Sequence, residues 1–399
     1  MGLRLSLTRP QSSQPQSAQL DPELKFWVAT HRVSGIGPAR FNQLLRHFGS
    51  VERAWSAPFS ELVASGIGQE NARSLMDLRN HTDPDHEMET LASLGLSAVR
   101  LHSDTYPYIL SEIYDPPPVL YCKGSIRPAD VNAVAVVGSR RCTAYGREMA
   151  RRISSGLAQF GLTVYSGLAR GIDGVAHRAT LDAGGRTVAV VGGGLDSIYP
   201  AEHAALAEEI VQNGGAVISE YPVGVRPKPE HFPRRNRVIS GLTVGVVVVE
   251  ATRKSGAMLT VKWALEQDRE VFAVPGSALS DNSEGPNWLI QQGAKLTTSH
   301  LDVLDELQIE VLQPPGSGEE SKREPTQGKL GVDSLARKNN GTDIEFRVHR
   351  HLVDVGVPCH VDEVSRSLSI PVAEIASALT VLALEGRVTE VGPMTFVTR

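Results

Sequence analysis

Between about residues 101 and 310, short apolar runs alternate with segments whose apolar positions recur every three or four residues. The run at residues 131–137 (VNAVAVV) is apolar at nearly every position, which is typical of a strand buried on both faces. The repeated strand–helix order predicts an α/β domain with an extended Rossmann-like, doubly wound parallel sheet. Further strands are predicted at residues 162–166, 187–191, 216–219, 244–250 and 270–274.

The segments that flank this domain follow other patterns. Residues 1–20 are rich in Gln, Ser and Pro, and we interpret them as a disordered tail rather than a signal peptide, because no apolar run follows the arginines there. Residues 21–100 show short helical patterns broken by glycines, which predicts an all-α domain. Residues 311–341 are rich in Pro, Gly and charge and predict a linker, and residues 342–399 form a compact last unit.

The first helical segment contains a weak repeat. Ser-Gly-Ile-Gly occurs at residues 34–37 and again at 65–68, and a helical pattern follows each copy. The arrangement resembles a tandem helix-hairpin-helix of a SAM-like domain, in which backbone amides at a helix start hold a DNA phosphate. The other interpretation is that these glycines only shape tight turns between helices. Acidic residues around the second copy favour phosphate contact at the first copy over the second.

The last unit reads as a helix, a short helix, a third helix and two strands, which is the order of a winged helix. Its third helix, PVAEIASALTVLALEG, offers no arginine or lysine before Arg387. A recognition helix without cations favours a protein-interaction module over a duplex-DNA reader, and both interpretations stay open.

Composition narrows the classes of function. The net charge of −5 argues weakly against a nucleic-acid partner, but phosphate binding needs only a local basic patch. The three cysteines, Cys122, Cys142 and Cys359, lie far apart, so the sequence predicts neither a metal site nor a disulfide framework and fits a reducing cytoplasm. No run approaches the roughly 20 apolar residues of a membrane span.

Turns rich in small residues follow the predicted strands. Because the carboxyl ends of parallel strands share one edge of a sheet, these turns should come together there. Small residues let backbone amides approach an anion, and each following helix directs its positive end toward it. We therefore predict an anion-binding cleft whose turns contribute Gly138, Ser139, Arg140, Ser166, Gly167, Arg170, Lys254, Ser255 and Gly256.

A basic loop lies between the fourth and fifth predicted strands. Residues 226–237 read RPKPEHFPRRNR, in which Glu230 is the one counter-charge. Arginine suits bidentate phosphate contact, and Phe232 and His231 are suited to stacking on bases. The alternative is a solvated loop ahead of a helix. We predict that this loop adds Lys228, Arg234, Arg235, Asn236 and Arg237 to the cleft.

Several enzyme motifs are absent. The chain has no G-x-x-x-x-G-K-[ST], no G-x-S-x-G and no G-x-G-x-x-G after its first long strand, where Arg140 occupies the place of a close glycine approach. We therefore predict no cofactor and no catalytic residue. The carboxylates Asp173, Asp196, Glu220 and Glu250 could act as general acid or base, but scattered loop acids more often accept hydrogen bonds from loop amides.

From about residue 103 to 305 the chain resembles the DprA/Smf family, the DNA-processing proteins of bacterial natural transformation. The matching stretches are VAVVGSR, YSGLARGIDGVAHRATL, TVAVVGGGLDSIYP, ISEYP, FPRRNRVISGL, VVVVEATRKSGAMLT, REVFAVPG and NWLIQQGA. The resemblance implies a non-enzymatic protein that binds single-stranded DNA on its Rossmann-like domain. It also implies a homodimer that loads RecA and eases displacement of single-strand-binding protein.

The resemblance also implies roles for particular residues. Arg140 takes the place of the arginine in the family's GSR motif, and Lys228, Arg235 and Arg237 belong to its basic stretch. Two lysines of some members are replaced here by Ala201 and Pro229, so the detailed phosphate path differs. The family's dimer surface maps to about residues 279–296, where the alternative is a core cluster formed by Leu279, Trp288, Leu289 and Ile290.

Two other functions compete with this one. Related folds include nucleotide phosphoribohydrolases of the LOG type, which carry a PGGxGTxxE motif at a strand-to-helix turn. The corresponding turn here, residues 254–260, lacks the paired glycines and the correctly spaced glutamate. The third possibility is a scaffold in which the winged helix and the dimer surface recruit RecA.

Overall fold

The computed structural model describes residues 21–127, 130, 132–308, 347–349, 351–352, 359–368, 370–384, 388–392 and 394–398. The described residues up to 308 belong to one compact unit, and those from 347 onward belong to a second. The predicted tail at residues 1–20 and the predicted linker at 311–341 lie outside the described residues.

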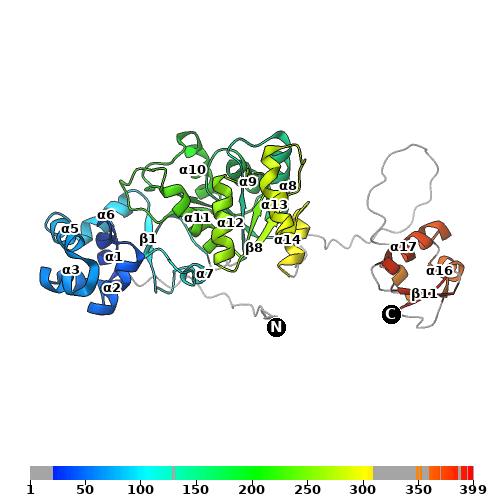
Figure 1. Ribbon diagram of the computed structural model, residues 1–399, viewed down its shortest axis with the longest axis horizontal. Helices are drawn as coiled ribbons and strands as arrows, with labels where there is room; N and C mark the ends of the chain where they lie inside the picture. Colours follow the sequence, from blue (N-terminus) through cyan, green and yellow to red (C-terminus); the bar gives the residue numbers. More distant parts are fainter. Residues whose placement is uncertain are drawn as a thin grey trace, which may run out of the picture. The chain divides into compact units, whose positions relative to one another are not determined.

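Short helices open the first unit, as the glycine-broken pattern predicts (Figure 1). The helix α2 begins after Gly37 with Pro38 in its first turn, where a missing N–H costs nothing, and ends at Gly49 in the left-handed region. The helix α5 begins after Gly68, so each Ser-Gly-Ile-Gly copy forms a turn ahead of a helix. The elements are α1 (Leu24–His31), α2 (Pro38–Phe48), α3 (Val51–Ser56), α4 (Phe59–Leu62), η1 (Val63–Ile67), α5 (Gln69–Arg79) and α6 (Pro84–Ser93).

A nine-stranded sheet follows, in the order β1-β2-β6-β5-β4-β3-β7-β8-β9. All pairings from β6 to β9 are parallel, which confirms the predicted Rossmann-like sheet. The antiparallel β1 and β2 extend it at one end and were not predicted. The strands are β1 (Ser97–Arg100), β2 (Val119–Gly124), β3 (Ala133–Val137), β4 (Thr163–Ser166), β5 (Thr187–Val191), β6 (Ala216–Ser219), β7 (Gly245–Val248), β8 (Glu270–Ala273) and β9 (Lys295–Leu296).

The central strand β3 is buried on both faces because helices cover both. Val134 and Val136 pack in a cluster with residues of α8, α9 and α14, whereas Ala133 and Ala135 belong to a cluster that includes α11 and α12. This alternation of period two explains the continuous apolar run. The covering elements are α7 (Tyr108–Ser111), α8 (Ala144–Gln159), α9 (Ile172–Asp182), η3 (Ala201–His203), α10 (Ala204–Gln212), α11 (His231–Gly241), α12 (Gly256–Glu266), α13 (Asp281–Gln291) and α14 (His300–Glu306).

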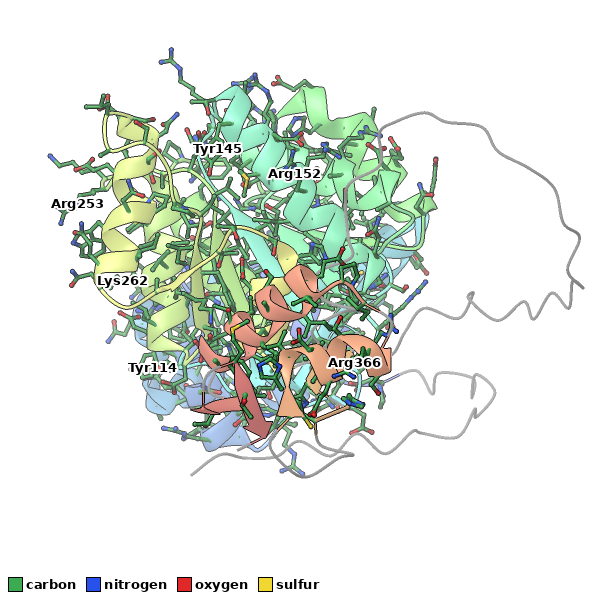
Figure 2. All side chains as sticks on the ribbon, turned by 90° about the vertical axis from the view of Figure 1, so that its right-hand side faces the viewer. Tyr114, Tyr145, Arg152, Arg253, Lys262 and Arg366 are labelled. Atoms are coloured by element: carbon green, nitrogen blue, oxygen red, sulfur yellow. The ribbon has the colours of Figure 1, made fainter. Side chains whose placement is uncertain are left out.

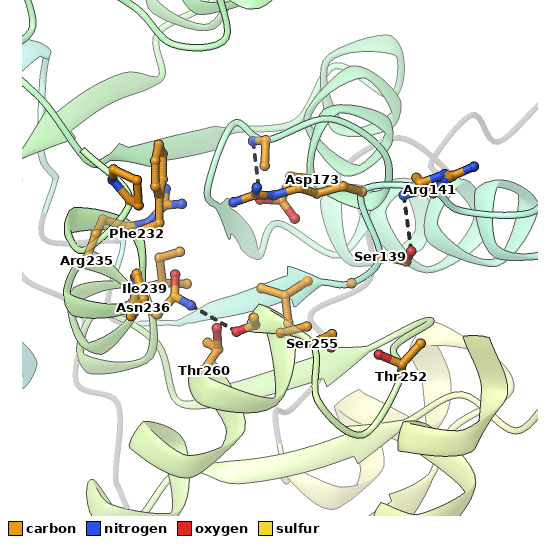
Figure 3. Close-up of a pocket in the computed structure, with 18 of the residues that line it drawn as sticks. Ser139, Arg141, Asp173, Phe232, Arg235, Asn236, Ile239, Thr252, Ser255 and Thr260 are labelled. Carbon is orange, nitrogen blue, oxygen red and sulfur yellow. Dashed lines mark hydrogen bonds between the residues drawn. The ribbon is translucent and has the colours of Figure 1, made fainter. Parts of the chain in front are cut away.

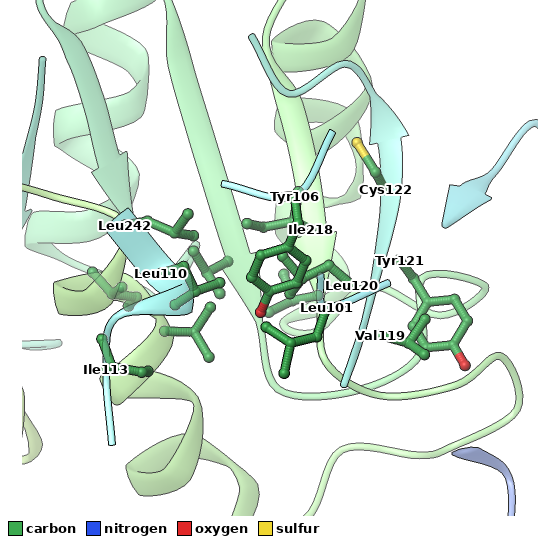
Figure 4. Packing of buried hydrophobic residues seen from close by; sticks show 14 of the residues in the cluster. Leu101, Tyr106, Leu110, Ile113, Val119, Leu120, Tyr121, Cys122, Ile218 and Leu242 are labelled. Atoms are coloured by element: carbon green, nitrogen blue, oxygen red, sulfur yellow. The ribbon is translucent and has the colours of Figure 1, made fainter. Parts of the chain in front are cut away.

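The helical segment and the sheet share one core. Leu120 and Tyr121 of β2 pack with residues from the segment that precedes the strand, as Figure 4 shows. His31 of α1 lies against Tyr121, with Nδ1 3.2 Å from the phenol oxygen and the rings stacked at 5.9 Å. Burial, together with the charge of Arg234, lowers the pKa of His31 to about 3, so the imidazole is neutral at this contact. The two segments therefore form one packed unit.

The second unit has its own core and a small sheet of order β10-β12-β11. The helix α17 carries no arginine or lysine, in line with the sequence analysis. Most of the helix predicted at residues 343–355 lies outside the described residues. The elements are β10 (Cys359–His360), α16 (Val361–Leu368), α17 (Val372–Leu384), β11 (Val388–Gly392) and β12 (Thr395–Thr398), which is the winged-helix order.

Among the described residues, no helix is both long enough and apolar enough to cross a membrane.

A buried ion pair ties together the amino ends of three strands. Arg186, just before β5, donates from Nε and Nη2 to the carboxylate of Asp130 at 2.6 and 2.7 Å. It also donates to the carbonyls of Gly214, ahead of β6, and Ser125. Asp130 in turn accepts from Thr163 of β4 at 3.0 Å. The side chains are 13% and 5% exposed, so loss of either partner leaves a charge without compensation.

We expect Arg186→Leu to lower the free energy of unfolding by about 3–5 kcal/mol, because it strands the buried Asp130 carboxylate. Arg178→Leu is the matched control, since its partner Glu209 and its own side chain are both more than a third exposed, and it should cost no more than about 1 kcal/mol. Urea unfolding, monitored by circular dichroism, measures the free energy of unfolding of both variants. Equal losses in the two variants would contradict the buried-pair account.

Candidate nucleic-acid interface

A cavity of about 650 Å³ lies beyond the carboxyl ends of β3 and β7, where the strand order reverses direction. Its walls come from the loop after β3, the first turns of α11 and the loop that leads into α12. Figure 3 shows Phe232, Arg235 and Asn236 of α11 on one side and Ser139 and Arg141 on the other. The predicted turns therefore meet at the predicted edge of the sheet.

Backbone contacts fix the loop after β3. The Ser139 N–H donates to the Glu250 carbonyl at 2.6 Å, and the Ser139 carbonyl accepts from the Ile172 N–H at 3.2 Å. A Cβ at Gly138 would lie 2.6 Å from Ile172 and 2.9 Å from the Glu250 carbonyl oxygen, so only glycine fits. The loop is thus clamped between the end of β7 and the start of α9, with Arg140 exposed at its tip.

Arg140 lies over an aromatic ring. Its Cζ is 5.4 Å from the centroid of Phe232, and Phe232 in turn contacts Tyr199, with centroids 5.6 Å apart. Tyr199 is half exposed. A guanidinium over a ring is attracted by the ring's quadrupole, and both planar groups keep surface toward the cavity. The three side chains, with Arg170, also surround a small adjoining pocket.

Arg235 sits beneath this surface rather than on it. It is 4% exposed and donates from Nη1 to the carbonyls of Gly167, at 2.7 Å, and Val190. Burial lowers the pKa of Arg235 to about 10, partly offset by the Asp173 carboxylate, so the guanidinium stays charged at neutral pH. Burial raises the pKa of Asp173, whose carboxylate accepts from the Gly167 N–H at 3.1 Å. Arg235 therefore joins α11 to the ends of β4 and β5.

Asn236 and Ser255 lie where α11 meets the start of α12. The Asn236 amide donates to the Gly256 carbonyl at 3.1 Å, which ties α11 to the first turn of α12. The hydroxyl of Ser255 is buried beside the cavity and has no hydrogen-bond partner in the described part of the chain. A buried hydroxyl without a partner favours a ligand that supplies one.

The basic loop splits between two surfaces. Arg237 is 2% exposed and pairs with the buried Glu220, with Asp115 3.6 Å from its Nε, so it has no free face for a strand. Arg234 and Lys228 point the other way. They line a second cavity of about 930 Å³ together with the first and second Ser-Gly-Ile-Gly turns. The start of α11 separates this cavity from the first one.

The structure brings half of the predicted residues to one place. Those that line the first cavity are Gly138, Ser139, Arg140, Arg235, Asn236, Ser255 and Gly256. Gly167 and Arg170 line the adjoining pocket, where Arg170 pairs with Glu202. Ser166 is fully buried and its hydroxyl donates to the Val136 carbonyl. Lys254 is exposed but does not line these cavities.

Sequence reasoning missed Tyr199, Thr252 and Asn282, which also line the cavity. Tyr199 comes from the long turn after β5, and its aromatic character was the one available signal. The stacking role predicted for Phe232 agrees with its position beneath Arg140.

The four carboxylates near the sheet edge are acceptors within the fold. The Asp196 carboxylate accepts from the Gly224 N–H at 2.9 Å, and Glu250 accepts from the Thr143 N–H at 2.8 Å ahead of α8. Asp173 accepts from loop amides and Glu220 pairs with Arg237. The prediction that these acids accept hydrogen bonds from loop amides is confirmed for Asp173, Asp196 and Glu250, whereas Glu220 pairs with an arginine instead. Among the described residues, no three His, Cys, Asp or Glu side chains gather as a metal site would require.

The predicted dimer surface is mixed in character. Leu279 is 96% exposed, whereas Leu289 is 3% exposed and belongs to the core. Trp288 and Ile290 are half-buried, and Arg253 covers the Trp288 ring at 4.9 Å. Leu279 alone of the four is a fully open apolar side chain.

Known proteins resemble this chain in sequence and in fold. The family model for DNA recombination-mediator protein A matches residues 97–308, and that for the DprA winged helix domain matches residues 348–392. The chain is 42% identical over 285 residues to Protein Smf of Escherichia coli, covering 71% of this chain and 72% of that protein. It is 47% identical over 206 residues to the DNA processing protein DprA of Streptococcus pneumoniae, covering 52% and 72%. The X-ray structure of DNA processing protein A from Streptococcus pneumoniae matches with a TM-score of 0.63 at 38% identity, covering 71% and 97%.

We expect Gly171→Ala to collapse the loop that carries Arg140. A Cβ at Gly171 would lie 2.2 Å from the Ser139 carbonyl oxygen and 2.8 Å from the Arg140 backbone, and the residue has a φ of 76°. Gly184→Ala is the comparison variant, because its φ of 71° is also positive but no atom lies within 4 Å of the new Cβ. Thermal unfolding should show a loss of about 1–2 kcal/mol for Gly184→Ala and a clearly larger loss for Gly171→Ala. Similar losses would show that steric contact with the loop is unimportant.

Proposed function

The chain belongs to the family of DNA recombination-mediator protein A, the DprA/Smf proteins, and on that premise we propose that it binds single-stranded DNA in the cavity beside Arg140. The observation that carries the proposal is the pair formed by the exposed Arg140 and the Phe232 ring beneath it. A guanidinium suits a phosphate, and the neighbouring ring suits a base.

Three further features support a nucleic-acid strand as the ligand. The loop after β3 is held by backbone hydrogen bonds, so Arg140 is positioned before a ligand arrives. The helices α9 and α12 begin at the same edge and direct their positive ends toward it. Phe232 and Tyr199 form an aromatic platform, which an unpaired base can reach and a base inside a duplex cannot.

The predicted residues take two roles in this proposal. Arg140, Ser139, Ser255 and Gly256 face the strand from the cavity wall. Arg235 and Arg237 act as positioning residues, because both are buried and hold α11 in place through Gly167, Val190 and Glu220. The basic loop and the family resemblance both predicted these arginines in contact with the strand, which their burial argues against. Gly138 and Arg170 border the strand at the margins of the first cavity. Lys228 and Arg234 line the second cavity instead, and Lys254 lines neither.

We infer that the bound strand is then handed to RecA. The family resemblance supports this role in natural transformation, with protection of incoming DNA and displacement of single-strand-binding protein as its parts. It also supports a homodimer, for which the open Leu279 is the clearest apolar contact on the predicted surface. The RecA role and the homodimer are both inferred from membership of the family, and no contact at the cavity bears on them.

A hydrolase of the LOG type is the second candidate function. That chemistry needs a carboxylate free to act on a ribose, and each of the four acids at this edge is already held by loop amides or an arginine. The turn at residues 254–260 forms the start of α12 without the motif glutamate. We therefore propose that the chain acts as a mediator without a reaction of its own.

We expect Phe232→Ala to weaken binding of a single-stranded oligonucleotide about fivefold to a hundredfold, which corresponds to about 1–3 kcal/mol for the missing stacking partner. Arg140→Ala should weaken binding comparably. It should also make the slope of log affinity against log salt concentration shallower by about 0.7 for each phosphate that is no longer neutralised. Fluorescence anisotropy across a salt series, with duplex of equal length as competitor, measures both effects.

Lys262→Ala serves as the control, because Lys262 lies on the exposed side of α12 and does not line the cavity (Figure 2). If both cavity variants bind the oligonucleotide as tightly as the wild type does, this cavity is not the DNA-binding site. Release of free base from a nucleoside monophosphate would point to the hydrolase instead.

A second experiment separates the mediator from the scaffold. A chain that lacks residues 311–399 should still speed RecA filament formation on DNA coated with single-strand-binding protein, whereas full-length Arg140→Ala should not. The RecA ATPase rate on coated single strands gives the readout. The reverse pattern, with loss on truncation and full activity of Arg140→Ala, would favour the scaffold.

A further inference from the structure

A groove between α8 and α9 gathers several arginines, of which the proposed function uses only Arg140. Its volume is about 590 Å³, and its lining includes Arg140, Arg141, Arg147, Arg151 and Arg178, with Asp182 as the one carboxylate among its lining residues. Because the whole chain carries a net charge of −5, such a concentration of arginines is a local feature.

The groove joins the first cavity. Arg140 and Arg141 line both, so a ligand that leaves the cavity past these residues enters the groove directly. The Arg141 N–H donates to the Ser139 hydroxyl at 3.1 Å, which holds this junction to the clamped loop after β3. The two hollows therefore form one continuous surface.

The helices present their arginines in rows. Arg147 and Arg151 are four residues apart on α8 and so lie on one face, about 6 Å apart along the axis. Arg178 faces them from α9. Gly171 and Gly174 also line the groove.

Most of this charge is not cancelled. Within the described chain, Arg140, Arg141 and Arg147 form no ion pair, and Arg147 instead donates to the Cys142 carbonyl at 3.0 Å. Arg151 and Arg152 share the single carboxylate of Glu148, at 2.8 and 2.6 Å, so one positive charge remains there. Arg178 alone has its own partner, Glu209.

We propose that this α8–α9 groove is an extension of the strand site, along which the phosphates of a longer single strand leave the first cavity. The inference rests on the proposed function, because the strand must first occupy the cavity beside Arg140. The groove carries arginines and no exposed aromatic side chain among its lining residues, so it suits the sugar–phosphate backbone rather than bases.

The test compares two lengths of oligothymidylate, about 6 and about 16 nucleotides, on the full chain. We expect Arg147→Gln/Arg151→Gln to bind the short strand as the wild type does and the long strand at least roughly tenfold more weakly. For the long strand, the slope of log affinity against log salt concentration should become shallower by about 1.4, because each of the two lost phosphate contacts contributes about 0.7. Arg147→Glu/Arg151→Glu should enlarge both effects.

The matched control is Arg46→Gln/Lys262→Gln, which removes the same charge from exposed positions of α2 and α12 outside the groove. Figure 2 labels Lys262. Thermal unfolding checks that each variant is folded. If the groove variants bind the long strand as tightly as the wild type does, the proposal is overturned. A loss of affinity only for duplex DNA or for an acidic protein partner overturns it as well. A wild type that binds neither strand removes the proposed function, and this extension with it.

Discussion

The guanidinium of Arg235, buried at the carboxyl edge of the sheet, is the constraint on which the interface depends. It bonds to the carbonyls of Gly167 and Val190, at the ends of two adjacent strands, and so fixes the first turn of α11 against β4 and β5. A buried charge that loses its partners costs several kcal/mol, so α11 cannot shift without breaking the fold locally. Phe232 lies three residues earlier in the same helix, and its place under Arg140 follows from that anchor.

The same edge explains how an acidic chain presents a basic surface. Its carboxylates are turned inward, where Asp173, Glu220 and Glu250 accept hydrogen bonds from amides or pair with Arg237. The arginines divide into those that neutralise these acids and those that stay in solvent, such as Arg140. Net charge counts both groups alike, so it says little about the field at the cavity.

The sequence pattern predicted the parts of the fold that burial dictates. Strands from β3 to β8 are largely buried and therefore form apolar runs in the sequence. The strand β1 and the two-residue β9 lack such runs and were missed, and β2 was missed although residues 119–122 form a buried apolar run. The edge of the sheet that holds the site followed from topology alone. Topology does not predict which arginine of the basic loop faces outward. Arg234 and Arg235 differ only in the face of α11 on which they lie, and that face is set by tertiary packing.

The groups left facing the cavity determine what kind of recognition it allows. The Asn236 amide donates one N–H to the Gly256 carbonyl, and the Asp173 carboxylate accepts from loop amides, so both side chains have fewer groups left for the edge of a base. The Ser255 hydroxyl both donates and accepts, and so does not discriminate between bases. The proposed function rests on the Arg140 guanidinium and the Phe232 ring, and phosphate charge and stacking are common to all nucleotides. Binding through these two groups would not depend on the sequence of the strand, which suits the mediator that we propose.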